Sequence, residues 1–132
     1  MSITTQNSFA HNTSTPLIHI DFINPITSQA FEQWLDEMTG LLTKKQTFFA
    51  MYHSQIDLVL PENYRAKEAL WYKAHKAEFF QYCQGLVRIA NDEAEREKLD
   101  TPALHQAWGV PYAVVMTQAQ AMEWINQQVE KA

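Results

Sequence analysis

The final quarter of the chain holds three structural signals in one short stretch, WGVPYAVVMTQAQAMEW, from Trp108 to Trp124. Gly109 and Pro111 are typical of a helix end, because glycine tolerates positive φ and proline cannot continue a helix. The segment YAVVM is apolar on both faces, which predicts a central parallel strand. Thr117 then predicts the start of another helix. Connections this short are typical of chains in which strands and helices alternate.

The same alternation extends through most of the 132 residues. Apolar alternation and short β-branched or aromatic runs predict strands near 17–23, 47–53, 86–90 and 112–116. Helical periodicity predicts helices from Thr27 or Ser28 to about 43, over 62–82, over 92–108 with a break at Thr101–Pro102, and from 117 onwards. Gly85 is expected to end the second helix in a left-handed conformation. This order predicts an α/β fold: one mostly parallel sheet of four to five strands, mixed at one edge at most, with helices packed on it.

The first 15 residues differ from the rest, since they are polar, rich in Ser, Thr and Asn, and lack a clear period. They predict a flexible N-terminal arm, with at most a weak edge strand around Ile3 or Phe9. Residues 16–132 are then expected to form a single α/β domain.

Composition narrows the classes of function and the compartment. A net charge of −5 and a pI near 5.4 argue against a nucleic-acid surface. No apolar run approaches the roughly 20 residues of a membrane helix, so no membrane insertion is expected. The N-terminus lacks the features of a secretory signal, and the single cysteine, Cys83, cannot form an internal disulfide. Together these features predict a cytoplasmic protein.

The long helix predicted over 62–82 has two apolar sides when its residues are placed at 100° steps. One side carries mainly small residues, and the other carries Tyr64, Trp71, Tyr72, His75, Phe79 and Tyr82. Either the aromatic side is core, or part of it binds a protein partner, a second subunit or an apolar ligand. The candidate binding residues are Trp71, Tyr72, His75 and Phe79. Trp71 is expected to be largely buried, with His75 and Phe79 accessible.

Motifs for catalysis, metals and cofactors are missing from the sequence. The five histidines form no His-x-x-His or His-x-x-x-His pair, so no metal site is predicted. Cys83 has no base placed beside it by spacing and is expected to be a buried core residue. The three glycines are not grouped, which excludes a glycine-rich phosphate loop. We therefore predict no cofactor and no catalytic residue.

Three stretches, AFEQWLDEMTGLL, ALWYKAHKAEFFQYCQGLVRIAND and WGVPYAVVMTQAQAMEWI, resemble the SpoIIAA-like proteins of the STAS type. These small bacterial domains are related in fold to anti-sigma-factor antagonists. The resemblance spans residues 17–130 and implies a four- or five-stranded sheet with helices, used in protein interaction or small-ligand sensing. The regulatory antagonists carry a phosphorylated serine in an Asp-Ser pair. No such pair occurs here, although Ser54 follows a predicted strand, so the phosphorylation switch is not expected.

The leading hypothesis is a non-enzymatic bacterial regulatory module that acts through protein–protein interaction, with a homodimer as one form of that association. The alternative is a binder of a small apolar or amphipathic ligand, with the aromatic residues lining its pocket. The third hypothesis is an uncharacterised enzyme. It ranks below the other two because no paired nucleophile and base stands out in the sequence. The sequence names neither the partner nor the ligand.

Overall fold

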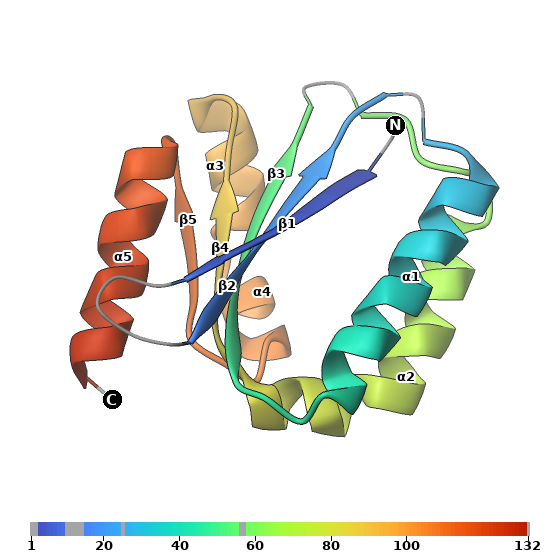
Figure 1. The fold of residues 1–132 in the computed structure, drawn as a ribbon. Helices are drawn as coiled ribbons and strands as arrows, with labels where there is room; N and C mark the ends of the chain where they lie inside the picture. The colour runs from blue at the N-terminus through green and yellow to red at the C-terminus, as the bar shows by residue number, and fades with distance from the viewer. Residues whose placement is uncertain (1–2, 10–14, 25, 56–57, 132) are drawn as a thin grey trace.

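The computed structural model describes residues 3–9, 15–24, 26–55 and 58–131 (Figure 1). Its strands are β1 (Ile3–Phe9), β2 (Pro16–Phe22), β3 (Phe48–Ser54), β4 (Cys83–Ile89) and β5 (Tyr112–Val115). Its helices are α1 (Ser28–Thr43), α2 (Tyr64–Tyr82), α3 (Glu93–Leu99), α4 (Pro102–Ala107) and α5 (Gln118–Lys131). From β2 onwards the order of strands and helices is the one that the sequence predicts.

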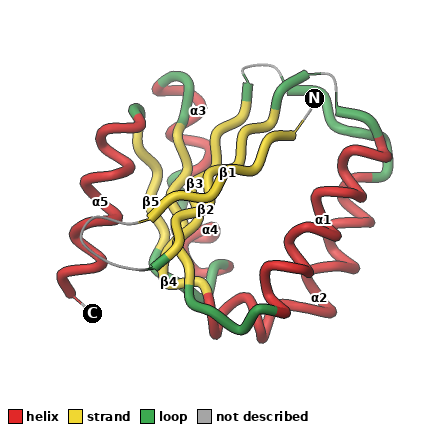
Figure 2. Tube along the Cα trace, in the orientation of Figure 1, coloured by secondary structure: helices red, strands yellow, loops and turns green. Residues whose placement is uncertain are grey.

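The strands form one sheet in the order β1-β2-β3-β4-β5, in which β1 is antiparallel to β2 and the other pairs are parallel. The predicted mostly parallel sheet, mixed at one edge, is therefore confirmed. Right-handed crossovers between adjacent parallel strands place all connecting helices on the same face. Accordingly, α1, α2 and α4 pack on one face, whereas α5 follows the last strand and covers the other (Figures 1 and 2).

Two strand predictions need correction. Residues Ile3–Phe9, expected to form a flexible arm with at most a weak edge strand, form an edge strand that pairs with the whole length of β2. This pairing satisfies the backbone groups along the outer edge of β2, which would otherwise stay unpaired. Residues 10–14 of the expected arm lie outside the described residues. The second correction is β5, which lies at the edge of the sheet, although both of its faces are covered.

The helix ends follow the predicted capping chemistry. The Thr27 hydroxyl accepts a hydrogen bond from the Ala30 N–H at 3.0 Å, which starts α1. Thr101 caps α4 through the Leu104 N–H at 3.2 Å and thereby separates α3 from α4, as predicted. Thr117 accepts from the Gln120 N–H at 3.1 Å at the start of α5.

The prediction that Gly85 and Gly109 adopt positive φ is wrong, since no glycine among the described residues does so. Gly85 lies inside β4, where a Cβ would approach the Trp124 ring to 3.0 Å. A Cβ on Gly109 would come within 2.7 Å of the Phe80 ring. Both positions need glycine because an aromatic ring packs directly against the backbone.

Candidate ligand-binding cleft

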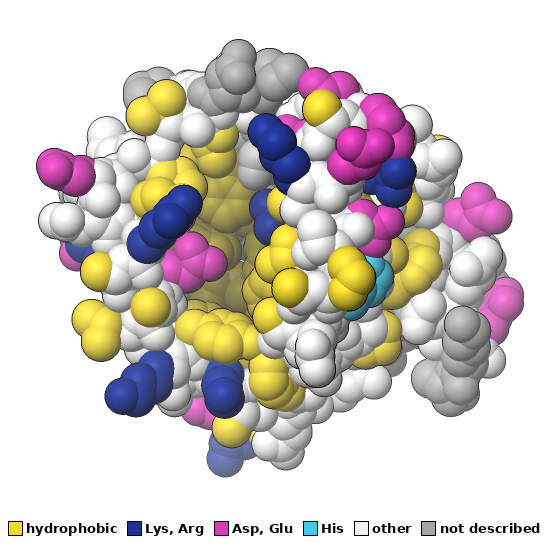
Figure 3. Space-filling view, turned by 180° about the vertical axis from the view of Figure 1, so that it is seen from behind, with side chains coloured by type: hydrophobic (Ala, Val, Ile, Leu, Met, Phe, Trp, Pro, Cys, Tyr) yellow, Lys and Arg dark blue, Asp and Glu magenta, His cyan; other side chains and the backbone are white. Residues whose placement is uncertain are grey.

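A cleft of about 170 Å³ lies between the sheet and the helices α1, α2 and α4. Figure 3 shows it as a hollow whose walls are mostly hydrophobic. Its lining is Phe22, Phe31, Trp34, Leu35, Met38, Tyr52, Ser54, Leu58, Leu60, Glu68, Trp71, Tyr72, Phe79, Arg88 and Trp108. Concave sites with mainly apolar walls and a few polar groups are typical of small-molecule binding.

The cleft exists because α2 touches the sheet closely near one end only. Phe79, close to the C-terminal end of this helix, is its single buried residue in the structure as described. Its ring packs edge-on against Phe48 of β3, with 6.0 Å between centroids. Further toward the N-terminus, α2 packs on α1, where the Trp71 indole donates to the Thr39 hydroxyl at 2.8 Å. The helix pair thus stands off from the sheet, and aromatic side chains line the space between.

The aromatic walls are fixed by contacts among residues from different elements. Trp34 of α1 packs edge-on against Phe22 of β2 at 5.1 Å and against Tyr52 of β3 at 6.4 Å. On the opposite side, Trp108 lies 5.8 Å from the Phe79 ring. Such edge-to-face arrays are favourable because the positive ring edge faces the negative ring face. They stabilise the shape of the cleft without filling it.

Charged and polar groups are few and come from three elements, β3, β4 and α2. Arg88 is half-buried in the cleft wall, and its strand neighbours in the sheet register are Tyr52 and Val114. Burial raises the pKa of the Tyr52 phenol, while the Arg88 guanidinium acts in the opposite direction. Burial also raises the pKa of the Glu68 carboxyl, again opposed by Arg88. Within the described ranges, Arg88 forms no direct ion pair with any carboxylate.

Two further polar atoms of lining residues have no partner. The indole N–H groups of Trp34 and Trp108 are buried and meet no hydrogen-bond acceptor in the described part of the chain. A buried donor without an acceptor is costly, because it has lost its hydrogen bond to water. These two N–H groups and the Arg88 guanidinium make the surroundings of the cleft richer in donors than in acceptors.

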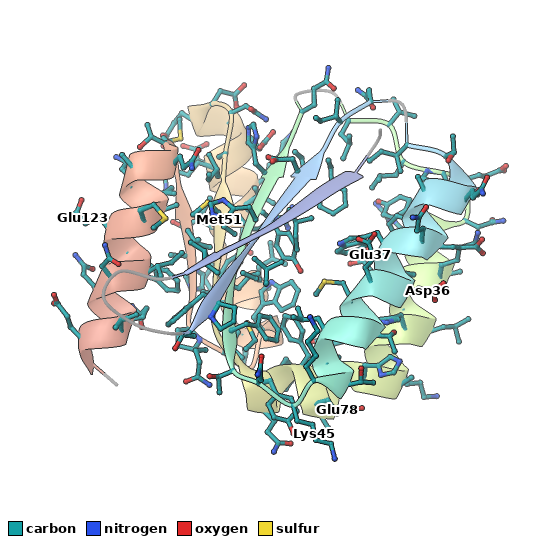
Figure 4. All side chains as sticks on the ribbon, viewed as in Figure 1. Asp36, Glu37, Lys45, Met51, Glu78 and Glu123 are labelled. Atoms are coloured by element: carbon teal, nitrogen blue, oxygen red, sulfur yellow. The ribbon has the colours of Figure 1, made fainter. Side chains whose placement is uncertain are left out.

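An outer groove of about 380 Å³ adjoins the cleft between α2 and α4. It shares Glu68, Tyr72, Arg88 and Trp108 with the cleft, so the two spaces have a common wall. Arg65 adds a second guanidinium there and donates to the Tyr64 hydroxyl at 3.0 Å. The acidic residues of the helix pair that Figure 4 labels, Asp36, Glu37 and Glu78, lie on its exposed surface instead.

The candidate residues of α2 fall into two groups. Trp71, Tyr72 and Phe79 line the cleft, whereas His75 is not among its lining residues. The expectation that Phe79 is accessible is wrong, since the residue is only 2% exposed and lies against β3. The His75 side chain is 26% exposed and packs on Trp71, 5.0 Å away. Whether any of these residues binds a partner or ligand stays a prediction.

The sequence interpretation missed the lining residues of the other elements, among them Trp34, Tyr52, Arg88 and Trp108. One signal was available, because Tyr52 and Arg88 alternate with residues of the opposite sheet face in their strands. An arginine that follows the apolar pair Leu86 and Val87 in the strand CQGLVRI marks a position where the sheet face is not fully covered.

A polar cluster lies elsewhere, at the carboxyl ends of β2 and β3. His53 Nδ1 is 3.5 Å from an Asp21 carboxylate oxygen, and its Nε2 is 3.0 Å from the Asn91 side-chain oxygen. Both ring nitrogens therefore face side-chain oxygen atoms, and this cluster lies apart from the lining of the cleft. Burial raises the pKa of the Cys83 thiol to about 12, so this side chain is not a nucleophile near neutral pH.

Comparison with known proteins places the fold. No family model and no curated protein matches the sequence. The structure is similar to the crystal structure of an uncharacterised protein of the DUF3478 family from Shewanella loihica PV-4, described as having a SpoIIAA-like fold. The two share 13% sequence identity over 94% of each chain, with a TM-score of 0.70. This similarity confirms the predicted SpoIIAA-like fold. None of the helices in the described segments has the length and hydropathy needed to span a membrane.

Proposed function

We propose that this SpoIIAA-like domain is a non-catalytic binding module that holds a small amphipathic ligand in the cleft between the sheet and α1, α2 and α4. The observation that carries this proposal is the cleft itself, with aromatic and aliphatic walls and a few polar groups at one side. Its volume of 170 Å³ compares with the cavity of about 150 Å³ that admits benzene in another protein. One ring or a short alkyl chain therefore fits.

The lining residues support binding without catalysis. Among the described residues that line the cleft there is no histidine or cysteine, and Glu68 is the one carboxylic acid. The described lining therefore lacks a second carboxylate for acid–base catalysis, and it lacks a histidine that could act as the base for a nucleophile. The hydroxyl of Ser54 lies at the end of β3, with no histidine beside it in the lining.

Tryptophan fluorescence tests the proposal, because Trp34, Trp71 and Trp108 all line the cleft. We expect a saturable change on addition of octan-1-ol or benzyl alcohol, and its loss in Ser54→Leu, which places a larger apolar side chain in the cleft. Ser28→Leu is the matched control, since Ser28 is exposed at the start of α1. The proposal fails when neither probe binds and native mass spectrometry of gently purified protein finds no retained small molecule.

Protein–protein association, the leading hypothesis from the sequence, is the second candidate. The observation that favours it is Leu70, which is 71% exposed on the solvent side of α2. A homodimer through this side predicts a molar mass in light scattering that rises with concentration and a monomer for Leu70→Glu. A constant monomer mass and no cross-linked partner in native cells would exclude this candidate.

Either function is proposed to work without a phosphorylation switch. The chain lacks an Asp-Ser pair, and Ser54 ends a strand rather than starting a helix, with α2 beginning only at Tyr64. Ser54→Asp is therefore expected to fold and to leave protein association unchanged. Stoichiometric phosphate on Ser54 in protein from its native cell would contradict this part of the proposal.

A further inference from the structure

We infer that the ligand is an amphipathic carboxylic acid, whose carboxylate is bound by Arg88 and whose apolar part occupies the aromatic cleft. The inference rests on the proposed function and adds the chemical class of the ligand. The volume of the cleft does not determine the class of ligand. The inference is based on the charges and hydrogen-bond donors of the residues around one wall.

Arg88 is the central group. It lines both the cleft and the outer groove, on the face of β4 that points toward α2 and α4, and it has no ion-pair partner within the described ranges. A half-buried guanidinium without a direct ion pair favours an anionic ligand, and its fork of N–H donors matches the two oxygens of a carboxylate. Arg88 also forms a side-chain hydrogen bond with the Tyr112 hydroxyl. Tyr52 and Tyr112 are both neutral near pH 7, since burial raises the pKa of each phenol, so neither supplies Arg88 with a negative charge.

The unpartnered indoles point to the same class of ligand. The Trp34 and Trp108 N–H groups belong to lining residues and can only donate. A carboxylic acid brings several acceptor lone pairs into this surrounding, whereas an ammonium head brings only donors. A cationic head group would bring no acceptor and would face the Arg88 guanidinium directly.

The charges that line the outer groove favour the approach of an anionic ligand to the cleft. The lining of the groove contains two arginines, Arg65 and Arg88, against one acid, Glu68, although the whole chain has a net charge of −5. An opening with locally positive charge in an acidic protein favours the approach of anions. The groove also adds about 380 Å³ next to the cleft, which allows an alkyl chain longer than one ring to extend outwards.

The charge of Glu68 allows a test of whether the ligand is an anion or a cation. This residue is the one carboxylate in the described lining and lies near Arg88 without pairing directly with it. A bound carboxylate would be repelled by an ionised Glu68, whereas a bound ammonium would be attracted. Removal of this charge should therefore tighten binding of an acid and weaken binding of an amine.

The experiment is isothermal titration calorimetry with octanoate, octan-1-ol and octylamine, which share one chain and differ in the head group. We expect octanoate to bind at least about 10-fold more tightly than octan-1-ol, as charge-assisted hydrogen bonds predict. Arg88→Gln should remove this preference, because it weakens octanoate binding much more than octan-1-ol binding, and Glu68→Gln should strengthen octanoate binding several-fold. Lys73→Gln, which removes a positive charge from the exposed side of α2, is the control and should change nothing.

Equal affinity for octanoate and octan-1-ol, or tightest binding of octylamine, would overturn the carboxylic acid while leaving the proposed cleft function in place. If none of these three compounds binds, and benzyl alcohol does not bind either, the proposed function itself fails. Circular dichroism and the melting temperature of Arg88→Gln establish that a loss of binding does not come from unfolding. Arg88→Lys, which keeps the charge but not the bidentate fork, should retain part of the preference.

Discussion

The two faces of the sheet are covered in different ways, one by the single helix α5 and the other by α1, α2 and α4. On one face, α5 lies close to β4 and β5, and Ala121 and Ile125 are fully buried against Leu17 and Val87. On the other face, α1 and α2 stand away from the strands and leave the cleft. Figure 4 shows Met51 of β3 on the side of α5, where it belongs to the closed core.

Residue size explains the difference. The closed face approaches its helix where β4 carries Gly85, which lets the Trp124 ring lie against the backbone. The open face is lined by large aromatic rings from both layers, including Trp34, Tyr52 and Trp108. Bulky rings that meet edge to face hold two layers apart, because neither can move closer without a clash. The close approach at Gly85 thus helps to close one core, and the large rings keep a space in the other.

The largest expected effect is a difference between two matched core truncations. Ile125→Ala on the closed face should destabilise the protein by about 4 kcal/mol, because a fully packed side chain leaves a new void. Leu35→Ala, at a position that already borders the cleft, should cost only about 2 kcal/mol because fewer contacts are lost. Urea denaturation of both variants measures this. Equal losses would mean that the open face is packed as tightly as the closed one.

The glycines give a second test of the closed face. Gly85→Ala should destabilise by about 1–2 kcal/mol, since its Cβ would press on Trp124 at 3.0 Å. Gly40→Ala is the control inside α1, where a Cβ meets no atom within 4 Å, and should stabilise by about 0.5–1 kcal/mol. Thermal unfolding compares the two variants. A neutral or stabilising Gly85→Ala would show that α5 does not need this close approach.

Filling the open face should stabilise it. Ser54→Leu adds apolar volume to the cleft and is expected to raise the free energy of unfolding by about 1 kcal/mol, while the proposed ligand no longer binds. Chemical denaturation, paired with the fluorescence titration, measures both effects. A destabilised Ser54→Leu that still binds octan-1-ol would show that the side chain does not enter the cleft.

The smallest effect concerns Glu68, whose pKa burial raises above its ordinary value of 4.5. The folded protein then holds this proton more tightly than the unfolded chain. The contribution of Glu68 to the free energy of unfolding therefore falls as pH rises through its unfolded-state and folded-state pKa values. At pH 7, Glu68→Gln should be more stable by a few tenths of a kcal/mol, since water screens this partly exposed group. The difference should vanish near pH 3.5, where both states are protonated. An unchanged difference at both pH values would contradict the desolvation of Glu68.

Local patterns by themselves determined the order of elements and much of their length. The apolar spacing of Phe31, Leu35, Met38 and Leu42 predicted the buried side of α1, and all four residues are buried. Thr101 and Thr117 marked helix starts because a side-chain oxygen can satisfy free N–H groups from within the same turn. These signals involve residues only a few positions apart, so the sequence displays them directly.

Tertiary structure alone decided which strands lie at the edges, why two glycines are needed, and where the cleft opens. The apolar pattern of YAVVM indicates two covered faces, but an edge strand flanked by helices has the same pattern. Gly85 and Gly109 face the rings of Trp124 and Phe80, which are distant in sequence. The cleft likewise combines Trp34, Tyr52 and Arg88 from three elements. No local spacing records such distances, because they follow from how the packed layers meet in space.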